Sequence, residues 1–188
     1  MSTRSDALLG VDAEDGPTNR ISDDDADRDR YAAFTDRNEY PLLVITTVSS
    51  DGERSGCLAG FASQCSIEPL RFLACISRAN HTFGVVQRAT VLALHLLGAE
   101  QTDTAALFGS LTGDEIDKFA HVGWHEGPRG IPILDDCAAW VAGEILVRVN
   151  AGDHEAHIIR PLDGGDGSKP GLLTNCNAPD LPAGHPAE

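Results

Sequence analysis

The chain has 188 residues, 41% of them apolar, and a formal net charge of −15. This length suits a single domain with a hydrophobic core. The negative charge argues against binding to nucleic acid or to an anionic membrane surface, because both attract basic side chains. No apolar run approaches the ~20 residues that a membrane-spanning helix needs, and no apolar signal segment is visible at the N-terminus.

Residues 1–30 are predicted to form a disordered acidic tail. They contain nine Asp and Glu residues against four Arg residues, and no aromatic residue. Such a segment cannot bury enough apolar surface to offset the entropy that is lost on ordering. An ordered domain is therefore expected over residues 31–161.

The domain is predicted to begin with a hairpin. Residues 42–48 and 54–62 flank Asp51-Gly52, a tight turn signal, because Gly accepts a positive φ and Asp bonds its own backbone. Residues 70–76 indicate a third buried strand. A short helix over residues 81–88 follows, and Ser77 or Asn80 can cap it.

Residues 90–97 are nearly all apolar, which indicates a central strand that needs cover on both faces, and we expect a second chain to supply part of it. Two short helices are predicted over residues 100–109 and 112–119, the second with a capping box at Thr112 and Glu115. Strands over residues 138–150 and 154–160 follow. Gly, Pro, Asp and Asn dominate residues 162–188, which we expect to be an extended or disordered tail. Short strands with turn signals and a few short helices indicate a mainly β barrel with helical insertions.

Small residues crowd the middle of this β region, at Gly56, Ala59, Gly60 and Ala62. Gly weakens a strand and often marks the close approach of a ligand or another backbone. Backbone N–H groups left open by small side chains can bind a flat polar ring or a phosphate, and a helix start at 80–82 would add an anion site. The alternative is a tightly packed sheet crossing without a ligand.

An ordered series of motifs resembles the flavin reductase-like family, which has an FMN-binding split-barrel fold. The series covers about residues 34–160 and reads Thr46-Thr47, Asp51-Gly52, Gly56, the run Ala59 to Ser66, Glu68-Pro69, Cys75, Asn80-His81-Thr82, Asp117-Lys118-Phe119, Gly130-Ile131-Pro132-Ile133-Leu134 and Gly152-Asp153-His154. The family usually has hydroxyl residues where this chain has Leu58, Gly60 and Phe61.

The resemblance implies a mainly β, FMN-binding split β-barrel with short helical insertions. It further implies NAD(P)H:flavin oxidoreductase activity, in which hydride passes from the nicotinamide to FMN or FAD. Reduced flavin would be released to a partner monooxygenase or held as a prosthetic group. The resemblance also implies that two copies of the chain form a homodimer, with the flavin pocket at the subunit interface.

The flavin site that the resemblance implies comprises two segments and one histidine. Backbone N–H groups along Leu58, Ala59, Gly60 and Phe61 would hold the ring. The ribityl and phosphate side would lie on Gln64, Cys65, Ser66, Arg78, Asn80, His81 and Thr82. By the same resemblance, His154 would lie near the ring and the nicotinamide, and its alternative role is that of a turn-stabilising residue.

Other chemistries have weaker support in the sequence. His121 and His125 have helical spacing but no acidic partner, and residues 154 and 157 of a strand point to opposite faces, so we expect no metal site. A catalytic Cys57, Cys65 or Cys75 matches no local signature. Five cysteines without a CxxC pair fit free thiols in a cytoplasmic protein. A non-catalytic flavin-binding or electron-relay protein, or a deazaflavin-using reductase, remains as the alternative function.

Overall fold

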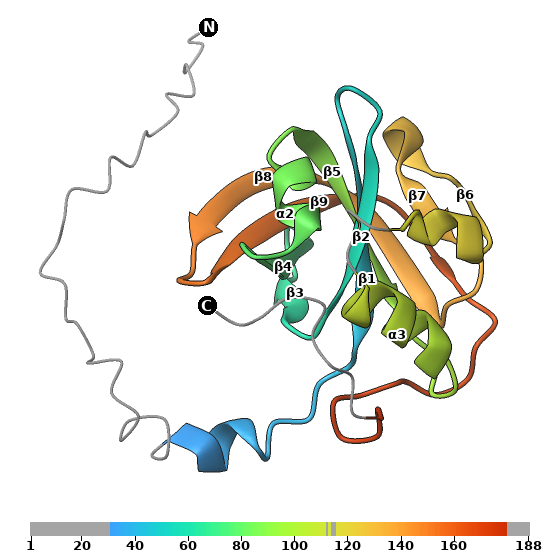
Figure 1. The fold of residues 1–188 in the computed structure, drawn as a ribbon. Helices are drawn as coiled ribbons and strands as arrows, with labels where there is room; N and C mark the ends of the chain where they lie inside the picture. Colours follow the sequence, from blue (N-terminus) through green and yellow to red (C-terminus); the bar gives the residue numbers. More distant parts are fainter. Residues whose placement is uncertain (1–30, 112, 114–115, 180–188) are drawn as a thin grey trace, which may run out of the picture. The chain divides into compact units, whose positions relative to one another are not determined.

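The computed structural model of the protein describes residues 31–111, 113 and 116–179. It divides into two units, residues 1–38 and residues 39–188 (Figure 1). In the first unit, residues 31–35 form a short helix, and the predicted acidic tail lies outside the described residues. The second unit holds the sheet and the residues of the candidate site.

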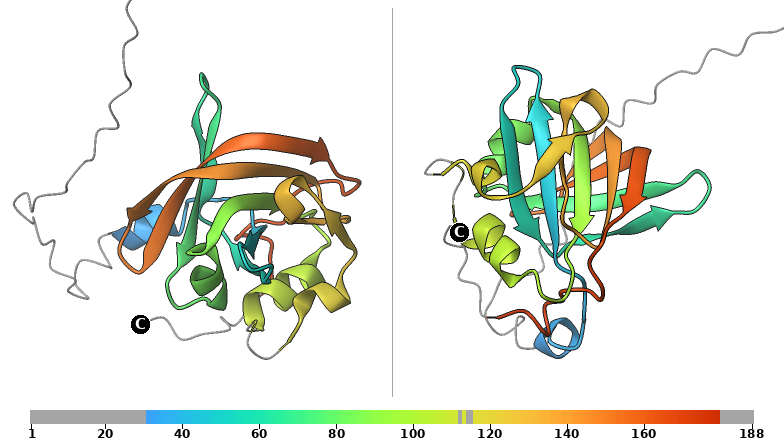
Figure 2. Two further views of the ribbon diagram at one scale, coloured as in Figure 1. Left: turned by 90° about the horizontal axis from the view of Figure 1, so that it is seen from above. Right: turned by 90° about the vertical axis from the view of Figure 1, so that its right-hand side faces the viewer.

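One antiparallel sheet of seven strands, in the order β2-β1-β5-β8-β9-β4-β3, forms the framework. The strands are β1 (Leu43–Ser49), β2 (Arg54–Ala59), β3 (Ala62–Ser66), β4 (Arg71–Ser77), β5 (Ala89–Leu96), β8 (Ala139–Asn150) and β9 (His154–Asp166). The sheet is strongly curved but not closed, because β2 and β3 are its free edges (Figure 2). The architecture confirms the mainly β, split-barrel fold with helical insertions.

Short elements complete the domain. They are α2 (His81–Val86), α3 (Thr102–Ser110), the 3₁₀ helices η1 (Lys118–His121) and η2 (Pro128–Gly130), and the small hairpin of β6 (Trp124–Glu126) and β7 (Pro132–Leu134). None of the described helices is both long enough and apolar enough to cross a membrane.

The main core lies on the concave side of the sheet, where apolar side chains from β1, β2, β4, β5 and β9 pack against α2. Two smaller clusters lie under α3 and under the β6–β7 hairpin. The strand expected at 90–97 is central, as its composition indicates, and Val91, Leu92, Ala93, Leu94 and Leu97 are all buried within the single chain. The expectation that a second chain must cover this strand was therefore wrong.

Two strands and one domain boundary differ most from the sequence prediction. The stretch 54–62 is not one strand, because the chain leaves β2 after Ala59 and begins β3 at Ala62, which pairs with β4 instead of β1. The last strand ends at Asp166 rather than at residue 160. Its partner β8 pairs with it along this whole length, and Ala139 of β8 lies opposite Asp166. The expected 161/162 boundary thus falls inside β9, and Leu173 beyond it is fully buried.

The predicted helix over residues 112–119 is described only in part. Residues 112, 114 and 115, which include both capping-box residues, lie outside the described residues. The described part contains the 3₁₀ turn η1. Asp117 caps this turn, because its side chain accepts a hydrogen bond from the Phe119 N–H at 3.0 Å.

Candidate functional site

The chain bends at Gly60 and Phe61, where it leaves β2 and enters β3. The Phe61 carbonyl oxygen accepts a hydrogen bond from the Cys75 N–H at 2.9 Å, which fixes this junction against β4. The backbone N–H groups of Gly60 and Phe61 donate no hydrogen bond within the described part of the chain. The Phe61 side chain is 56% exposed. The junction therefore presents two free donors beside an exposed aromatic ring.

Gly60 is required here because an aromatic ring packs directly on its backbone. A Cβ at position 60 would lie 2.3 Å from Cε2 of Tyr40, much closer than any real contact. Tyr40 is itself held in place, since its N–H donates to Oδ1 of Asn175 at 2.8 Å. The rings of Tyr40 and Phe61 are neighbours, with centroids 5.9 Å apart.

His154 is brought to the same junction by the pairing of β4 with β9. Ala74 and Ile76 of β4 point into the core, so Cys75 and Ser77 face the other side of the sheet. His154 pairs directly with Ser77 and shares that face. The rings of Phe61 and His154 meet edge to face, with centroids 5.4 Å apart. The convex face of the sheet thus carries a shelf, which we define as Gly60, Phe61, Cys75, Ser77 and His154.

Asp153 orients the His154 ring. Its Oδ1 lies 2.9 Å from Nδ1 of His154, and this hydrogen bond lowers the pKa of the Asp153 carboxyl. Because a carboxylate only accepts hydrogen bonds, Nδ1 carries the proton. Nε2 is then the acceptor of the neutral ring and is left for another partner.

Arg78 adds a positive charge at the end of β4. Its N–H donates to the Asp153 carbonyl oxygen at 2.9 Å, which ties the two loops together. Its guanidinium lies over the Phe83 ring, 5.6 Å from the centroid. The arrangement places a permanent cation next to the loop that carries His154.

Two further predicted residues of the ring segment serve mainly in packing. The side chains of Leu58 and Ala59 pack against the two larger apolar clusters. They can contribute backbone groups but no polar side chain. The binding of the ring by the backbone N–H groups of Leu58 and Ala59 therefore stays a prediction.

Gln64, Cys65 and Ser66 lie further along β3, away from His154. Gln64 pairs with Phe72, whereas His154 pairs with Ser77, and five residues of β4 separate these positions by about 16 Å. The Gln64 side chain donates to the Ser66 carbonyl oxygen at 3.2 Å. The structure does not bring these three residues to His154.

Asn80, His81 and Thr82 stand at the start of α2. Asn80 is the N-cap residue but forms no side-chain cap hydrogen bond. Thr82 is buried, with its hydroxyl 2.9 Å from that of Ser55. His81 turns toward Glu53, with Nε2 3.2 Å from Oε1. Of these three predicted phosphate ligands, the side chains of His81 and Thr82 are thus engaged elsewhere.

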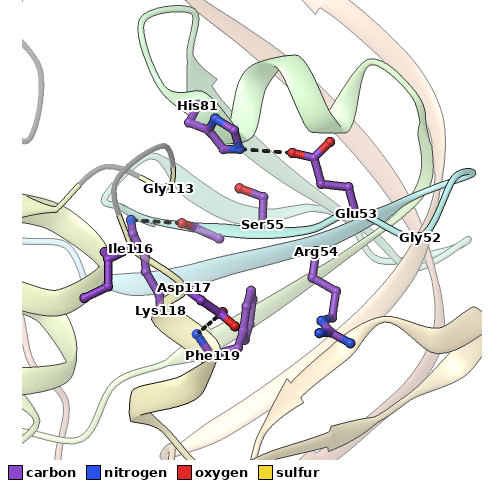
Figure 3. Close-up of a pocket in the computed structure, with 11 residues that line it drawn as sticks. Gly52, Glu53, Arg54, Ser55, His81, Gly113, Ile116, Asp117, Lys118 and Phe119 are labelled. Atoms are coloured by element: carbon purple, nitrogen blue, oxygen red, sulfur yellow. Dashed lines mark hydrogen bonds and ion pairs between the residues drawn. The ribbon is translucent and has the colours of Figure 1, made fainter.

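His81 and Glu53 belong to a polar cavity of about 360 Å³ between β2, α2 and η1 (Figure 3). Lys118 stands in its wall, 5% exposed, and donates to the carbonyl oxygens of Gly56 at 3.2 Å and Phe108 at 3.1 Å. Burial lowers the pKa of its ammonium. The structure thus gives the Lys of the Asp117-Lys118-Phe119 motif a structural role, in which it binds the free edge of β2.

A second cavity, of about 440 Å³, opens on the concave side of the sheet. Its walls are mostly apolar and include Leu43, Phe72, Leu94, Leu96 and Val141. Only Gln64 of the predicted site lines it. The two cavities therefore lie apart from the shelf, and neither gathers the predicted residues.

Cys57 and Cys75 do not have the properties of nucleophiles. Burial raises the pKa of Cys57 to about 11 and also raises the pKa of Cys75. Both groups are thus protonated thiols near neutral pH, whereas the reactive form of a cysteine is the thiolate. The described residues also contain no group of three or more His, Cys, Asp or Glu side chains placed to hold a metal ion.

The donor set of the shelf fits a flavin ring. A planar ring with carbonyl and imine acceptors needs a few fixed donors and an apolar neighbour, and the two free N–H groups and the Phe61 ring supply them. Arg78 carries a guanidinium of the kind that pairs with a phosphate. Sequence reasoning missed Tyr40, which shapes the junction, and gave Asp153 no role although it stands in the Gly152-Asp153-His154 motif.

Comparisons with known proteins find similar chains among flavin reductases and reductase subunits. The reductase subunit HsaB of a flavin-dependent monooxygenase from Rhodococcus jostii (strain RHA1) is 32% identical over 60% of this chain and 56% of its own length. The FMN reductase (NADH) RutF of Pseudomonas syringae pv. syringae (strain B728a) is 28% identical over 70% of this chain and 74% of its own. The chain spans only about half the length of several curated relatives that it matches.

A solved structure shows the same fold. The flavin reductase domain protein from Arthrobacter sp. FB24 superposes with a TM-score of 0.71 at 22% identity, over 86% of this chain and 98% of its own. The family model described as "Flavin reductase like domain" matches residues 35–177, which is most of the sequence. The chain therefore belongs to the flavin reductase like domain family.

Proposed function

We propose that the chain is an NAD(P)H-dependent flavin reductase that binds FMN, or alternatively FAD, on the shelf. The observation that carries this proposal is the edge-to-face contact of the Phe61 and His154 rings, next to two backbone N–H groups that have no partner among the described residues. The names of its relatives, among them an FMN reductase (NADH), support the same reaction.

The roles of the residues follow from their positions. When bound, the flavin would accept hydride from the nicotinamide and supply the redox chemistry. The N–H groups of Gly60 and Phe61 would bind the ring, and Arg78 would bind the phosphate. Asp153 holds the His154 tautomer that leaves Nε2 as an acceptor, so His154 can orient a hydrogen-bond donor or hold a proton at that atom. The contributions of Gln64, Cys65, Ser66 and Asn80 stay predictions.

We further propose that reduced flavin passes to a partner monooxygenase. The support is that several relatives are named as reductase subunits or components of monooxygenases. Five free thiols, all among the described residues, favour a reducing compartment such as the cytoplasm.

A homodimer is proposed because exposed apolar side chains gather on the two hairpins β3–β4 and β8–β9. They are Ile67, Leu70, Leu146, Val147, Val149 and Leu162, each at least 40% exposed. Apolar surface of this kind commonly marks an interface between proteins. Three shelf residues, Cys75, Ser77 and His154, belong to the same hairpins, so a second chain would also border the flavin site.

The deciding experiment is a titration of the purified protein with FMN and with FAD, followed by addition of NADH or NADPH. We expect flavin to bind and its visible absorbance to bleach anaerobically when the nicotinamide is added. Flavin binding without bleaching would favour the electron-relay alternative. Binding of a deazaflavin but not of FMN or FAD would favour the deazaflavin alternative.

A further inference from the structure

We propose that Phe61 is the aromatic contact that retains the flavin ring on the shelf and sets how tightly the flavin is held. This inference rests on the proposed function. According to this inference, one exposed side chain largely determines the affinity for flavin, and so whether the flavin stays bound or exchanges rapidly.

The position of Phe61 is fixed although its side chain is exposed. Its carbonyl oxygen is bonded to the Cys75 N–H, and the preceding Gly60 is pressed against the Tyr40 ring. Tyr40 is anchored in turn through Asn175. An aromatic ring that is already held in place loses little conformational entropy when a ligand covers it. Most of the favourable contact energy then contributes to the binding affinity.

The surroundings of Phe61 specify what can cover it. Its own N–H and that of Gly60 are the free donors of the shelf, and the His154 ring meets it edge to face at 5.4 Å. Because the two rings are in contact, a planar ligand that lies against His154 at this junction would also lie against the Phe61 ring. Such a ligand is planar, carries acceptors on one edge and has an aromatic face, which are properties of an isoalloxazine.

An aliphatic residue at this position would supply area but no aromatic face. Aromatic contacts add affinity beyond the area they bury, and base-like rings that stack on an aromatic side chain lose about ten- to hundredfold in affinity when that side chain is removed. We therefore expect Phe61→Ala to weaken FMN binding about ten- to hundredfold, and Phe61→Tyr to bind nearly as wild type.

The test uses the full chain and measures the FMN dissociation constant, the quenching of FMN fluorescence on binding, and the sedimentation coefficient. Phe61→Ala is compared with Phe61→Tyr and with Leu172→Ala, a control that truncates another exposed apolar residue outside the shelf. Weaker binding together with lost quenching in Phe61→Ala alone, at an unchanged sedimentation coefficient and melting temperature, supports the inference.

Other outcomes overturn it in distinguishable ways. If wild type and Phe61→Ala bind FMN equally and quench it equally, Phe61 does not contact the ring, while the proposed function stands. If Phe61→Ala dissociates a dimer but retains FMN, the side chain is covered by a second chain instead. If wild type binds no flavin at all, the proposed function and this inference both fail.

Discussion

His95, in the middle of β5, shows how a titratable residue can serve the core. It is fully buried, with Nδ1 3.1 Å from the Val44 carbonyl oxygen and Nε2 accepting from the Leu134 N–H at 3.2 Å. The ring must be neutral to make both bonds, and burial lowers the pKa of His95 to about 4. His95 thus joins β1, β5 and β7 and takes no part in the shelf.

This depressed pKa makes stability depend on pH. Below about pH 6.5 His95 is protonated in the unfolded chain, whereas in the folded chain it stays neutral down to about pH 4. The stability of the fold therefore falls as the pH falls from about 6.5 to about 4. Between pH 7 and pH 5 the loss from this residue should be about 2 kcal/mol. Urea unfolding at both pH values checks this, with His95→Gln as the non-titrating comparison. An equal loss in the variant would show that His95 does not cause it.

His154 has a different environment, since its side chain is 25% exposed and its hydrogen-bond partner among the described residues is the carboxylate of Asp153. We predict that His154→Ala lowers NAD(P)H-dependent flavin reduction by at least about tenfold, because a positioned proton-holding group commonly contributes about 10²–10⁴-fold and one that only orients a substrate contributes less. The melting temperature should stay close to wild type, since no core contact is lost. Stopped-flow reduction at saturating NAD(P)H measures the effect, and an unchanged rate would leave His154 as a turn residue.

At the scale of elements, the β2–β3 junction decides where the site lies. The sequence places its small residues in one strand, but the chain turns within that run, so Phe61 faces β9 instead of continuing the β1–β2 ladder. The turn depends on the packing of Tyr40 against Gly60.

Gly60→Val should therefore abolish or strongly weaken flavin binding. Its side chain would collide with the Tyr40 ring and shift the two free N–H donors, while the rest of the sheet keeps its pairing. Far-ultraviolet circular dichroism should remain native. Gly84→Ala is the control, because a Cβ at Gly84 meets nothing within 4 Å. Flavin affinity unchanged in Gly60→Val would place the ring elsewhere.

For the whole molecule, the acidic N-terminal segment is expected to be dispensable. Residues 1–28 have no apolar periodicity and a high negative charge. Deleting them should leave the melting temperature and the flavin affinity unchanged. A fall of several degrees in the melting temperature would show that the segment packs against the domain.

The second prediction at this scale is the homodimer. The exposed apolar side chains on the β3–β4 and β8–β9 hairpins should be covered by a second copy. Sedimentation at micromolar concentration should give twice the chain mass, and Leu146→Glu together with Val149→Glu should shift the protein toward a monomer. A monomeric wild type that still binds flavin would refute the dimer.

The sequence by itself determined the class of fold, because strand periodicity and turn chemistry are local. Asp51-Gly52 gives the β1–β2 hairpin, Gly152 with φ 96° gives the β8–β9 turn, and the apolar run at 90–97 gives the central strand. The ordered motifs also indicated the family that the comparisons show. These features of the sequence prediction agree with the structure because each depends on a few neighbouring residues.

Only the tertiary structure decided which predicted residues meet. Strand pairing is non-local, so the register that joins Ser77 to His154 and separates both from Gln64 is set by the whole sheet. The turn of His81 toward Glu53, the burial of Thr82 against Ser55 and the contact of Tyr40 with Gly60 join residues that are 20 or more positions apart. Local sequence does not determine such contacts, because they form only when the curved sheet brings distant segments together.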